Sequence, residues 1–185
     1  AHEKRASGGD TLFVNLFMAS TLDWKDKGIK VTQATSFPDT DTTRLTIDGA
    51  GRFAMKIRYP GWVAPGRMEV KVNGKAVKLD GKPGDYVTVE RTWQKGDRVD
   101  VRLPMTTRLE QMPDKSNYYA VLHGPVVLAA KTRMLGDEKL QFLADDSRMG
   151  HIASGPVCPM EAAPMLVSDT PNFVERFAPV KGKPL

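Results

Sequence analysis

MEVKVNGKAVKL, residues 68–79, is the stretch of sequence that decides the fold. Its centre, Asn73-Gly74, supplies two residues that accept positive φ, as the two-residue turn of a β-hairpin requires. Apolar and polar residues alternate on both sides of this turn, so the hairpin has one buried face. The turn fixes these cross-strand pairs: Val72 with Lys75, Val70 with Val77, Met68 with Leu79, and Glu69 with Lys78.

The same period of two extends to neighbouring segments. Residues 52–59 place Phe53, Met55, Ile57 and Tyr59 on one face, and residues 43–47 turn Leu45 and Ile47 inward. A second hairpin is predicted around a turn at residues 92–97, with these apolar residues opposed: Val87 and Val89 against Val99, Val101 and Leu103. Short strands about ten residues apart, without a helical pattern between them, predict an all-β, antiparallel, jelly-roll-like β-sandwich.

Three segments are apolar on both faces. They are residues 12–18, residues 120–122 and residues 126–130, the last two flanking Gly124-Pro125. Strands of this composition are usually central in a sheet or covered on both sides. We therefore expect residues 12–18 to be buried or to contact a neighbouring domain.

The turn-rich segment at residues 112–117 suggests a domain boundary. Residues 1–112 are predicted to form the β-sandwich domain, and residues 113–185 a second, smaller β-rich region that is partly loop and incomplete. A short helix is expected near residues 137–143. The chain begins Ala1-His2-Glu3 without a methionine, so we expect it to be a piece of a longer protein.

Composition excludes several classes of protein. The net charge of +5 arises in residues 1–112, which hold 19 basic and 14 acidic residues spread over many predicted strands. Neither a basic stripe nor a recognition motif accompanies this charge, so nucleic acid is not an expected partner. No apolar run reaches the ~20 residues that span a bilayer, and the N-terminus lacks the apolar stretch of a secretory signal. A membrane partner is therefore not expected either.

Reactive side chains do not form a catalytic or metal-binding pattern. Cys158 is the single cysteine, and its spacing from the histidines does not suggest a metal site, so no cofactor is predicted in this chain. Cys158 is interpreted as a small loop or core residue, and His123 as a hydrogen-bonded structural histidine. The carboxylate pairs Asp137-Glu138 and Asp145-Asp146 are interpreted as solvated turns. No catalytic residue is assigned.

Three tryptophans are the candidate site residues: Trp24, Trp62 and Trp93. Each lies at a predicted strand end or in a turn. Aromatic rings at such a rim can stack on sugars, which would make the chain an autonomous carbohydrate-binding module. Alternatively, they close the end of the core or dock a neighbouring domain, because a large ring with one polar atom suits a half-buried rim. We favour the second interpretation of the tryptophans. A third hypothesis for the chain as a whole is an adhesion sandwich unrelated to sugars.

The order of the segments adds a family resemblance. Five segments resemble, in sequence and in spacing, the region downstream of the catalytic barrel in β-L-arabinofuranosidases of glycoside hydrolase family 127 and relatives. They are TLFVNLFMASTLDWKDKGIKVTQATSFPDTDTTRLTI at 11–47, FAMKIRYPGWV at 53–63, KVNGKAV at 71–77, DYVTVERTWQKGDRVDVRLPM at 85–105 and NYYAVLHGPVVLAA at 117–130. The resemblance covers residues 10–130 well and continues more loosely to the end.

This resemblance implies a place within a larger glycoside hydrolase. Members have an α/α-barrel catalytic domain followed by β-sandwich domains, and their zinc site and nucleophile come from a glutamate and several cysteines. No position in this sequence matches those residues, so the resemblance transfers no catalytic or metal-binding residue. It implies that the chain is a non-catalytic accessory region, inactive alone, of this larger enzyme, which we call the parent. The implied partners are the parent's catalytic barrel and plant-type arabinose-containing glycans. The substrate class implies a periplasmic, surface or extracellular parent.

Overall fold

The computed structural model of the chain describes residues 10–116, 118–128 and 173–176. The described residues up to Leu128 belong to one compact unit, and Phe173–Arg176, a short 3-10 turn (η3), belongs to a second. The helix predicted near residues 137–143, Cys158 and the two adjacent carboxylate pairs lie outside the described residues. No helix among the described residues has the length and hydropathy that crossing a membrane requires.

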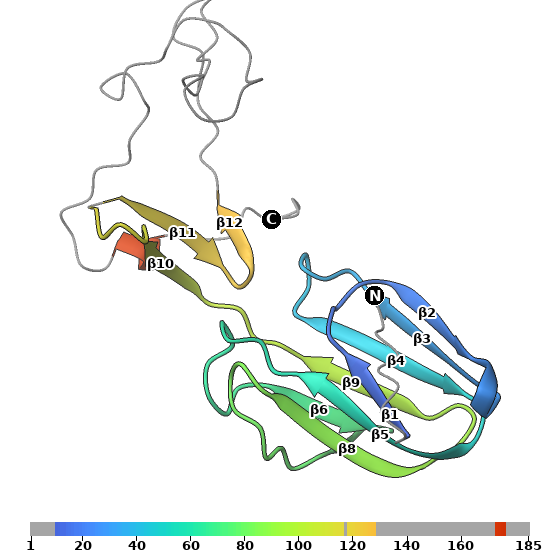
Figure 1. The fold of residues 1–185 in the computed structure, drawn as a ribbon. Helices are drawn as coiled ribbons and strands as arrows, with labels where there is room; N and C mark the ends of the chain where they lie inside the picture. Colours follow the sequence, from blue (N-terminus) through green and yellow to red (C-terminus); the bar gives the residue numbers. More distant parts are fainter. Residues whose placement is uncertain (1–9, 117, 129–172, 177–185) are drawn as a thin grey trace, which may run out of the picture. The chain divides into compact units, whose positions relative to one another are not determined.

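Two sheets form the layers of a sandwich (Figure 1). The three-stranded sheet has the order β1 (Thr11–Val14), β5 (Gly51–Arg58), β8 (Tyr86–Trp93). The six-stranded sheet has the order β2 (Ser20–Trp24), β3 (Ile29–Thr35), β4 (Thr42–Asp48), β9 (Arg98–Arg102), β6 (Glu69–Val72), β7 (Lys75–Ala76). A 3-10 turn, η1 (Lys25–Lys27), joins β2 to β3.

The core lies between these two sheets, as the alternating pattern predicts. β5 turns Phe53, Met55 and Ile57 inward, and β4 contributes Leu45 and Ile47, all at most 1% exposed. The prediction of an all-β sandwich is confirmed. Except for β1, which runs parallel to β5, every paired strand in it is antiparallel to its neighbours.

The hairpin at the Asn73-Gly74 turn is confirmed from the turn out to Val70 and Val77. Both turn residues have positive φ, 51° and 80°, and Val72 pairs with Lys75 as predicted. The strand after the turn ends at Ala76, but the Val77 N–H donates to the Val70 carbonyl oxygen at 2.9 Å, as the predicted Val70–Val77 pair requires. The Glu69–Lys78 pair stays a prediction; on its other side Glu69 is opposite Arg102 of β9, with an ion pair of 3.4 Å.

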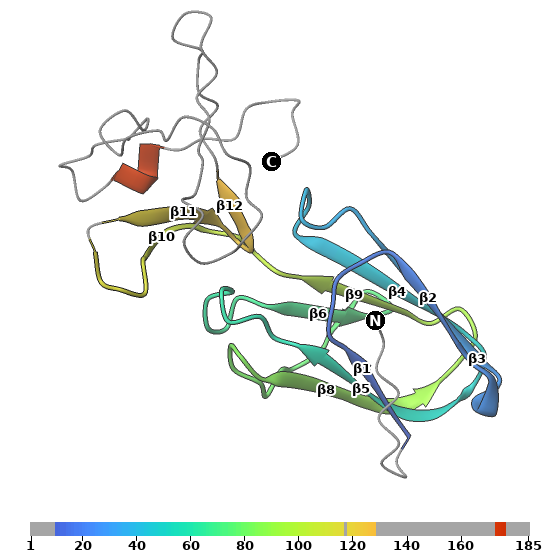
Figure 2. The same cartoon turned by 45° about the horizontal axis from the view of Figure 1, so that its top comes forward.

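The predicted second hairpin is also wrong. β8 pairs with β5 in one sheet, whereas β9 lies between β4 and β6 in the other, as Figure 2 shows from a second direction. The segment between β8 and β9 therefore crosses from sheet to sheet. The valines of both strands do turn inward, but they belong to opposite layers of the core and not to neighbouring strands. Alternation identifies the buried face of a strand without identifying its neighbours.

The segment at 12–18 is not a central strand. Only Thr11–Val14 is extended, at the edge of the three-stranded sheet. Leu12, Val14 and Phe17 are buried, but Leu16 and Met18 are 46% and 58% exposed. The described residues do not cover this segment on both sides, and its expected contact with a neighbouring domain stays a prediction.

A third sheet contains β10 (Thr107–Gln111), β11 (Tyr119–His123) and β12 (Val126–Leu128) in that order, all antiparallel. β11 is central, as the apolar pattern predicts. Val127 is nevertheless 61% exposed, so cover on both sides is not found among the described residues. The domain boundary at residue 112 stays a prediction.

Candidate functional site

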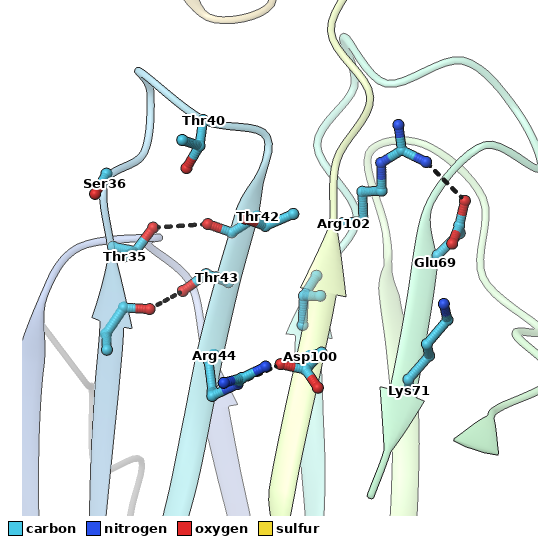
Figure 3. A pocket seen from close by; sticks show the side chains of 12 residues that line it. Thr35, Ser36, Thr40, Thr42, Thr43, Arg44, Glu69, Lys71, Asp100 and Arg102 are labelled. Carbon is cyan, nitrogen blue, oxygen red and sulfur yellow. Dashed lines mark hydrogen bonds and ion pairs between the residues drawn. The ribbon is translucent and has the colours of Figure 1, made fainter. Parts of the chain in front are cut away.

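An open groove lies on the outer face of the six-stranded sheet, with a volume of about 820 Å³ (Figure 3). It crosses β3, β4, β9 and β6, and the β3–β4 loop contributes Ser36 and Thr40. Because side chains alternate along a strand, most of the lining residues are polar ones opposite the core, whereas Thr43 and Val101 are buried residues of the inner face. The lining residues are Ala34, Thr35, Ser36, Thr40, Thr42, Thr43, Arg44, Glu69, Lys71, Asp100, Val101 and Arg102.

Ion pairs hold the charged side chains of this groove in place. Arg44 Nε lies 2.6 Å from Asp100 Oδ1 on the neighbouring strand. Arg102 Nε lies 2.9 Å from Asp41 Oδ2, and its Nη1 lies 3.4 Å from Glu69 Oε1. The hydrogen bond and charge of Asp41, followed by the charge of Glu69, raise the pKa of Arg102 above its ordinary value. The guanidinium is thus a fixed positive group with two carboxylates around it.

Hydroxyl groups shape the end of the groove nearest the β3–β4 loop. Thr35 Oγ1 donates to the carbonyl oxygen of Thr42 at 3.0 Å and accepts from the backbone N–H of Phe37 at 2.9 Å. These two bonds tie the start of the loop to both flanking strands. The groove is therefore a built polar surface and not only a gap between mobile side chains.

A second candidate is the aromatic end of the sandwich, which we define as Phe17, Phe37 and Trp62 together with the exposed Leu16 and Met18. Phe17 lies 5.8 Å from Phe37, which stacks on Trp62 with ring centroids 6.1 Å apart. The three rings come from three different connections between strands. Exposed aliphatic side chains beside a row of aromatic rings are typical of a surface that contacts another protein domain.

Gln33 of β3 fixes the main chain of this aromatic end. Its Nε2 donates to the carbonyl oxygen of Leu16 at 3.2 Å and to Thr43 Oγ1 at 3.2 Å. The Gln33 side chain belongs to a residue only 2% exposed. A buried amide that bonds the connection after β1 holds Leu16 at the surface in one position.

The three tryptophans have different environments. Trp93 is fully buried, stacks on Phe53 at 5.4 Å and donates from Nε1 to the Phe53 carbonyl oxygen at 3.0 Å. It presents no ring face for a sugar or another domain. Trp24 is half-buried, contacts Phe53 edge-on, and carries Lys27 Nζ over its ring at 5.3 Å. Trp62 is half-buried with one face against Phe37, so the structure does not bring the three rings together as a platform.

Other candidate groups have structural partners. His123 Nδ1 lies 3.0 Å from Thr107 Oγ1 on the paired strand, which agrees with a hydrogen-bonded structural histidine. In the described part of the chain, no three His, Cys, Asp or Glu side chains converge as metal ligands would.

Sequence reasoning missed the groove. Its residues form an alternating polar pattern in four strands, which looks like an ordinary solvated sheet face in each strand separately. The sequence signal that could reveal the groove is a set of threonines, acidic residues and basic residues at outward positions of these strands. Using that signal requires knowledge that β9 lies between β4 and β6.

Comparisons with known proteins match this chain to two protein families and to part of several solved structures. Residues 11–105 match the family described as β-L-arabinofuranosidase, GH127 middle domain, and residues 108–185 match a domain of unknown function. Among solved structures, a glycoside hydrolase is 34% identical over 63% of this chain, with a TM-score of 0.56. A GH127 β-L-arabinofuranosidase from Geobacillus stearothermophilus T6 is 32% identical over 64% of it, with a TM-score of 0.55. A further GH127 β-arabinofuranosidase has the same three values.

The chain is much shorter than these solved proteins. It covers 20% of the first two and 22% of the third. A comparison with curated protein sequences gave no match.

Proposed function

Because this chain belongs to the GH127 β-L-arabinofuranosidase middle-domain family, we propose that it is a non-catalytic accessory β-sandwich that supports the catalytic barrel of a larger glycoside hydrolase. A middle domain has neighbours within its own polypeptide, and the related solved chains are about three times as long, because 63–64% of this chain covers only 20% of theirs. The parent's glycosidase chemistry, with any zinc centre, is assigned to its catalytic domain. The glycans on which the parent acts are proposed to contain arabinofuranosyl groups.

The aromatic end carries the docking role in this proposal. Leu16 and Met18 are 46% and 58% exposed although they flank the buried Phe17. Leaving two large apolar side chains in water is unfavourable by ~25 cal/mol for each Å² that a partner could cover. A neighbouring domain that covers them gains this free energy without a change in the sandwich itself. The hydrogen bond from Gln33 Nε2 to the Leu16 carbonyl oxygen fixes the main chain between β1 and these two exposed side chains before docking.

A platform of rim tryptophans is less well supported as a carbohydrate site. The buried Trp93 is unavailable, and Trp24 and Trp62 each have one ring contact inside the chain already. Both half-buried rings instead suit the alternative of closing the ends of the core or bordering a docked domain.

The docking role is tested by comparing the isolated chain with its full-length parent. Leu16→Lys and Met18→Lys alter exposed side chains, so the melting temperature of the isolated chain should change by about 2 °C or less. In the parent, each charge would be buried at the contact, and the melting temperature should fall by about 5 °C or more. Thr21→Lys, at an exposed position of β2 opposite the uncharged Thr32, is the matched control and should change neither protein.

Two results would contradict the proposal. One is a parent protein that carries both lysine substitutions and keeps the melting temperature of the unaltered parent. The other is hydrolysis of an aryl β-L-arabinofuranoside by the purified chain that disappears when one of its own carboxylates is replaced.

A further inference from the structure

The outer-face groove has a pattern of polar groups that a docking role for the aromatic end does not explain. Pairing of β4 with β9 and of β9 with β6 sets residues opposite one another across the sheet. Two neighbouring rows result: Arg44–Asp100–Lys71 and Thr42–Arg102–Glu69. Within a row the strands are ~4.8 Å apart, and the two rows are ~7 Å apart along the strands. Hydrogen-bond donors and acceptors therefore alternate over a distance of several ångströms in both directions.

This alternation selects the chemistry of a ligand. An anion only accepts hydrogen bonds and is matched by a surface of donors, whereas a cation is matched by acceptors alone. A hydroxyl group donates one hydrogen bond and accepts others, so a run of neighbouring hydroxyls requires donors and acceptors side by side. We propose that the outer-face groove binds a neutral oligosaccharide through its hydroxyl groups.

The charge of the groove agrees with a neutral ligand. Arg44 is paired with Asp100, and Arg102 is placed between Asp41 and Glu69. Lys71 is the lining cation with no ion pair recorded in the described part of the chain, and Figure 3 shows it extending along β6 toward Glu69. The site thus offers one flexible ammonium donor beside two fixed guanidinium groups, with carboxylates between them.

The groove also has the dimensions and rigidity of a binding site. Its volume of about 820 Å³ lies within the ~300–1,000 Å³ that small-molecule sites occupy. The 2.6 Å contact between Arg44 and Asp100 orients both side chains before a ligand arrives, which reduces the ordering that binding requires. No aromatic ring is among the twelve lining residues, so hydrogen bonds alone would hold the sugar. Affinity in the millimolar range is therefore expected.

The choice of sugar rests on the proposed function, while the choice of site does not. Linear arabino-oligosaccharides are the probe because the parent is proposed to act on arabinofuranosyl groups. The complete 185-residue chain, labelled with ¹⁵N, is titrated with them and followed by amide chemical shifts. We expect saturable shifts at Ala34, Arg44, Lys71 and Asp100, with little change between low and high salt because the ligand carries no charge.

Single substitutions identify the groups that bind. Arg44→Ala and Lys71→Ala each remove donors from one row and should weaken binding about tenfold. The matched control is Arg52→Ala, which removes an exposed cross-strand ion pair of the same kind, Arg52 with Glu90 at 3.0 Å, from the other sheet. The Arg52→Ala variant should bind the oligosaccharide with the same affinity as the unaltered chain. All three variants should stay folded because exposed ion pairs contribute little to stability.

Several outcomes would overturn the inference. These are the absence of saturable shifts at millimolar sugar, shifts centred on the Trp24 and Trp62 indoles, and an equal loss of affinity in Arg52→Ala. Tighter binding of oligogalacturonate that disappears at high salt would identify an anion site instead. None of these results bears on docking, which is measured by the melting temperature of the parent. Failure at the groove and failure of the proposed function are therefore separable.

Discussion

Asn73 Nδ2 donates a hydrogen bond of 2.8 Å to Asp97 Oδ1, joining the turn between β6 and β7 to the segment that carries the chain from β8 to β9. The other Asp97 oxygen accepts from the backbone N–H of Gln94 at 2.9 Å. Asn73 Oδ1 in turn accepts from the backbone N–H of Arg98 at 2.9 Å. Asp97 is only 7% exposed, so this small network fixes the corner at which the chain changes sheets.

Replacing Asn73 tests the contribution of this network. Asn73→Gly keeps a residue that accepts positive φ and removes only the side-chain bonds. We expect the free energy of unfolding to fall by about 1–3 kcal/mol, since one lost bond has a charged acceptor in a nearly buried site. Urea unfolding measures it. Lys75→Ala, at an exposed position of the same hairpin, is the control, and an equal effect of both variants would contradict this explanation.

The stability of the chain should depend on pH through Asp97. The hydrogen bond from Asn73 is the largest cause that lowers the pKa of this carboxyl below its ordinary value, with smaller contributions from Gln94 and Arg91 against the opposing effect of burial. A carboxyl with a lowered folded pKa adds stability above its unfolded pKa of ~3.9, and this stability is lost as the pH falls through the folded value.

The loss in free energy of unfolding that Asn73→Gly causes should therefore shrink as the pH falls from about 7 to about 3. Urea unfolding across this range checks the prediction. If the difference in free energy of unfolding stays constant over this range, the stabilisation by Asn73 does not depend on the charge of Asp97.

The buried Trp93 should dominate the tryptophans in stability. Trp93→Ala removes a fully enclosed indole and leaves the Phe53 carbonyl oxygen without its donor, so we expect a loss of about 3–5 kcal/mol. Trp62→Ala acts on a half-buried ring and should lose less. Chemical denaturation followed by circular dichroism compares the variants without relying on tryptophan fluorescence. A larger effect of Trp62 would contradict the assignment of Trp93 to the core.

Gly49 occupies the turn between β4 and β5, where the chain changes sheets. Its φ is 133°, and an added Cβ would lie 2.7 Å from the carbonyl oxygen of Gly28. Gly49→Ala should therefore destabilise the chain by about 1–3 kcal/mol, measured by thermal unfolding. Gly61→Ala is the control, because an added Cβ there meets nothing within 4 Å. Equal melting temperatures for the two variants would refute the steric explanation.

Local chemistry was enough to predict the turn at Asn73-Gly74 and the inward faces of β4 and β5. In both cases the deciding information lies within a few residues: positive φ at the turn, and a period of two along each strand. The tryptophans show where such information ends. Trp24 and Trp93 end their strands and Trp62 lies in a turn, yet Trp93 is fully buried and the other two are half-buried, because burial depends on what the opposite sheet places over each ring.

By itself, then, the sequence determined the all-β class, the buried residues of most strands and the hairpin turn. Only the tertiary structure decided that β8 and β9 belong to opposite sheets, that Glu69 pairs with Arg102, and that four strands assemble one polar groove. The physical reason is that alternation records contact with water or with core for each residue separately. Strand neighbours are chosen by packing between segments far apart in the chain, which no single stretch of sequence records.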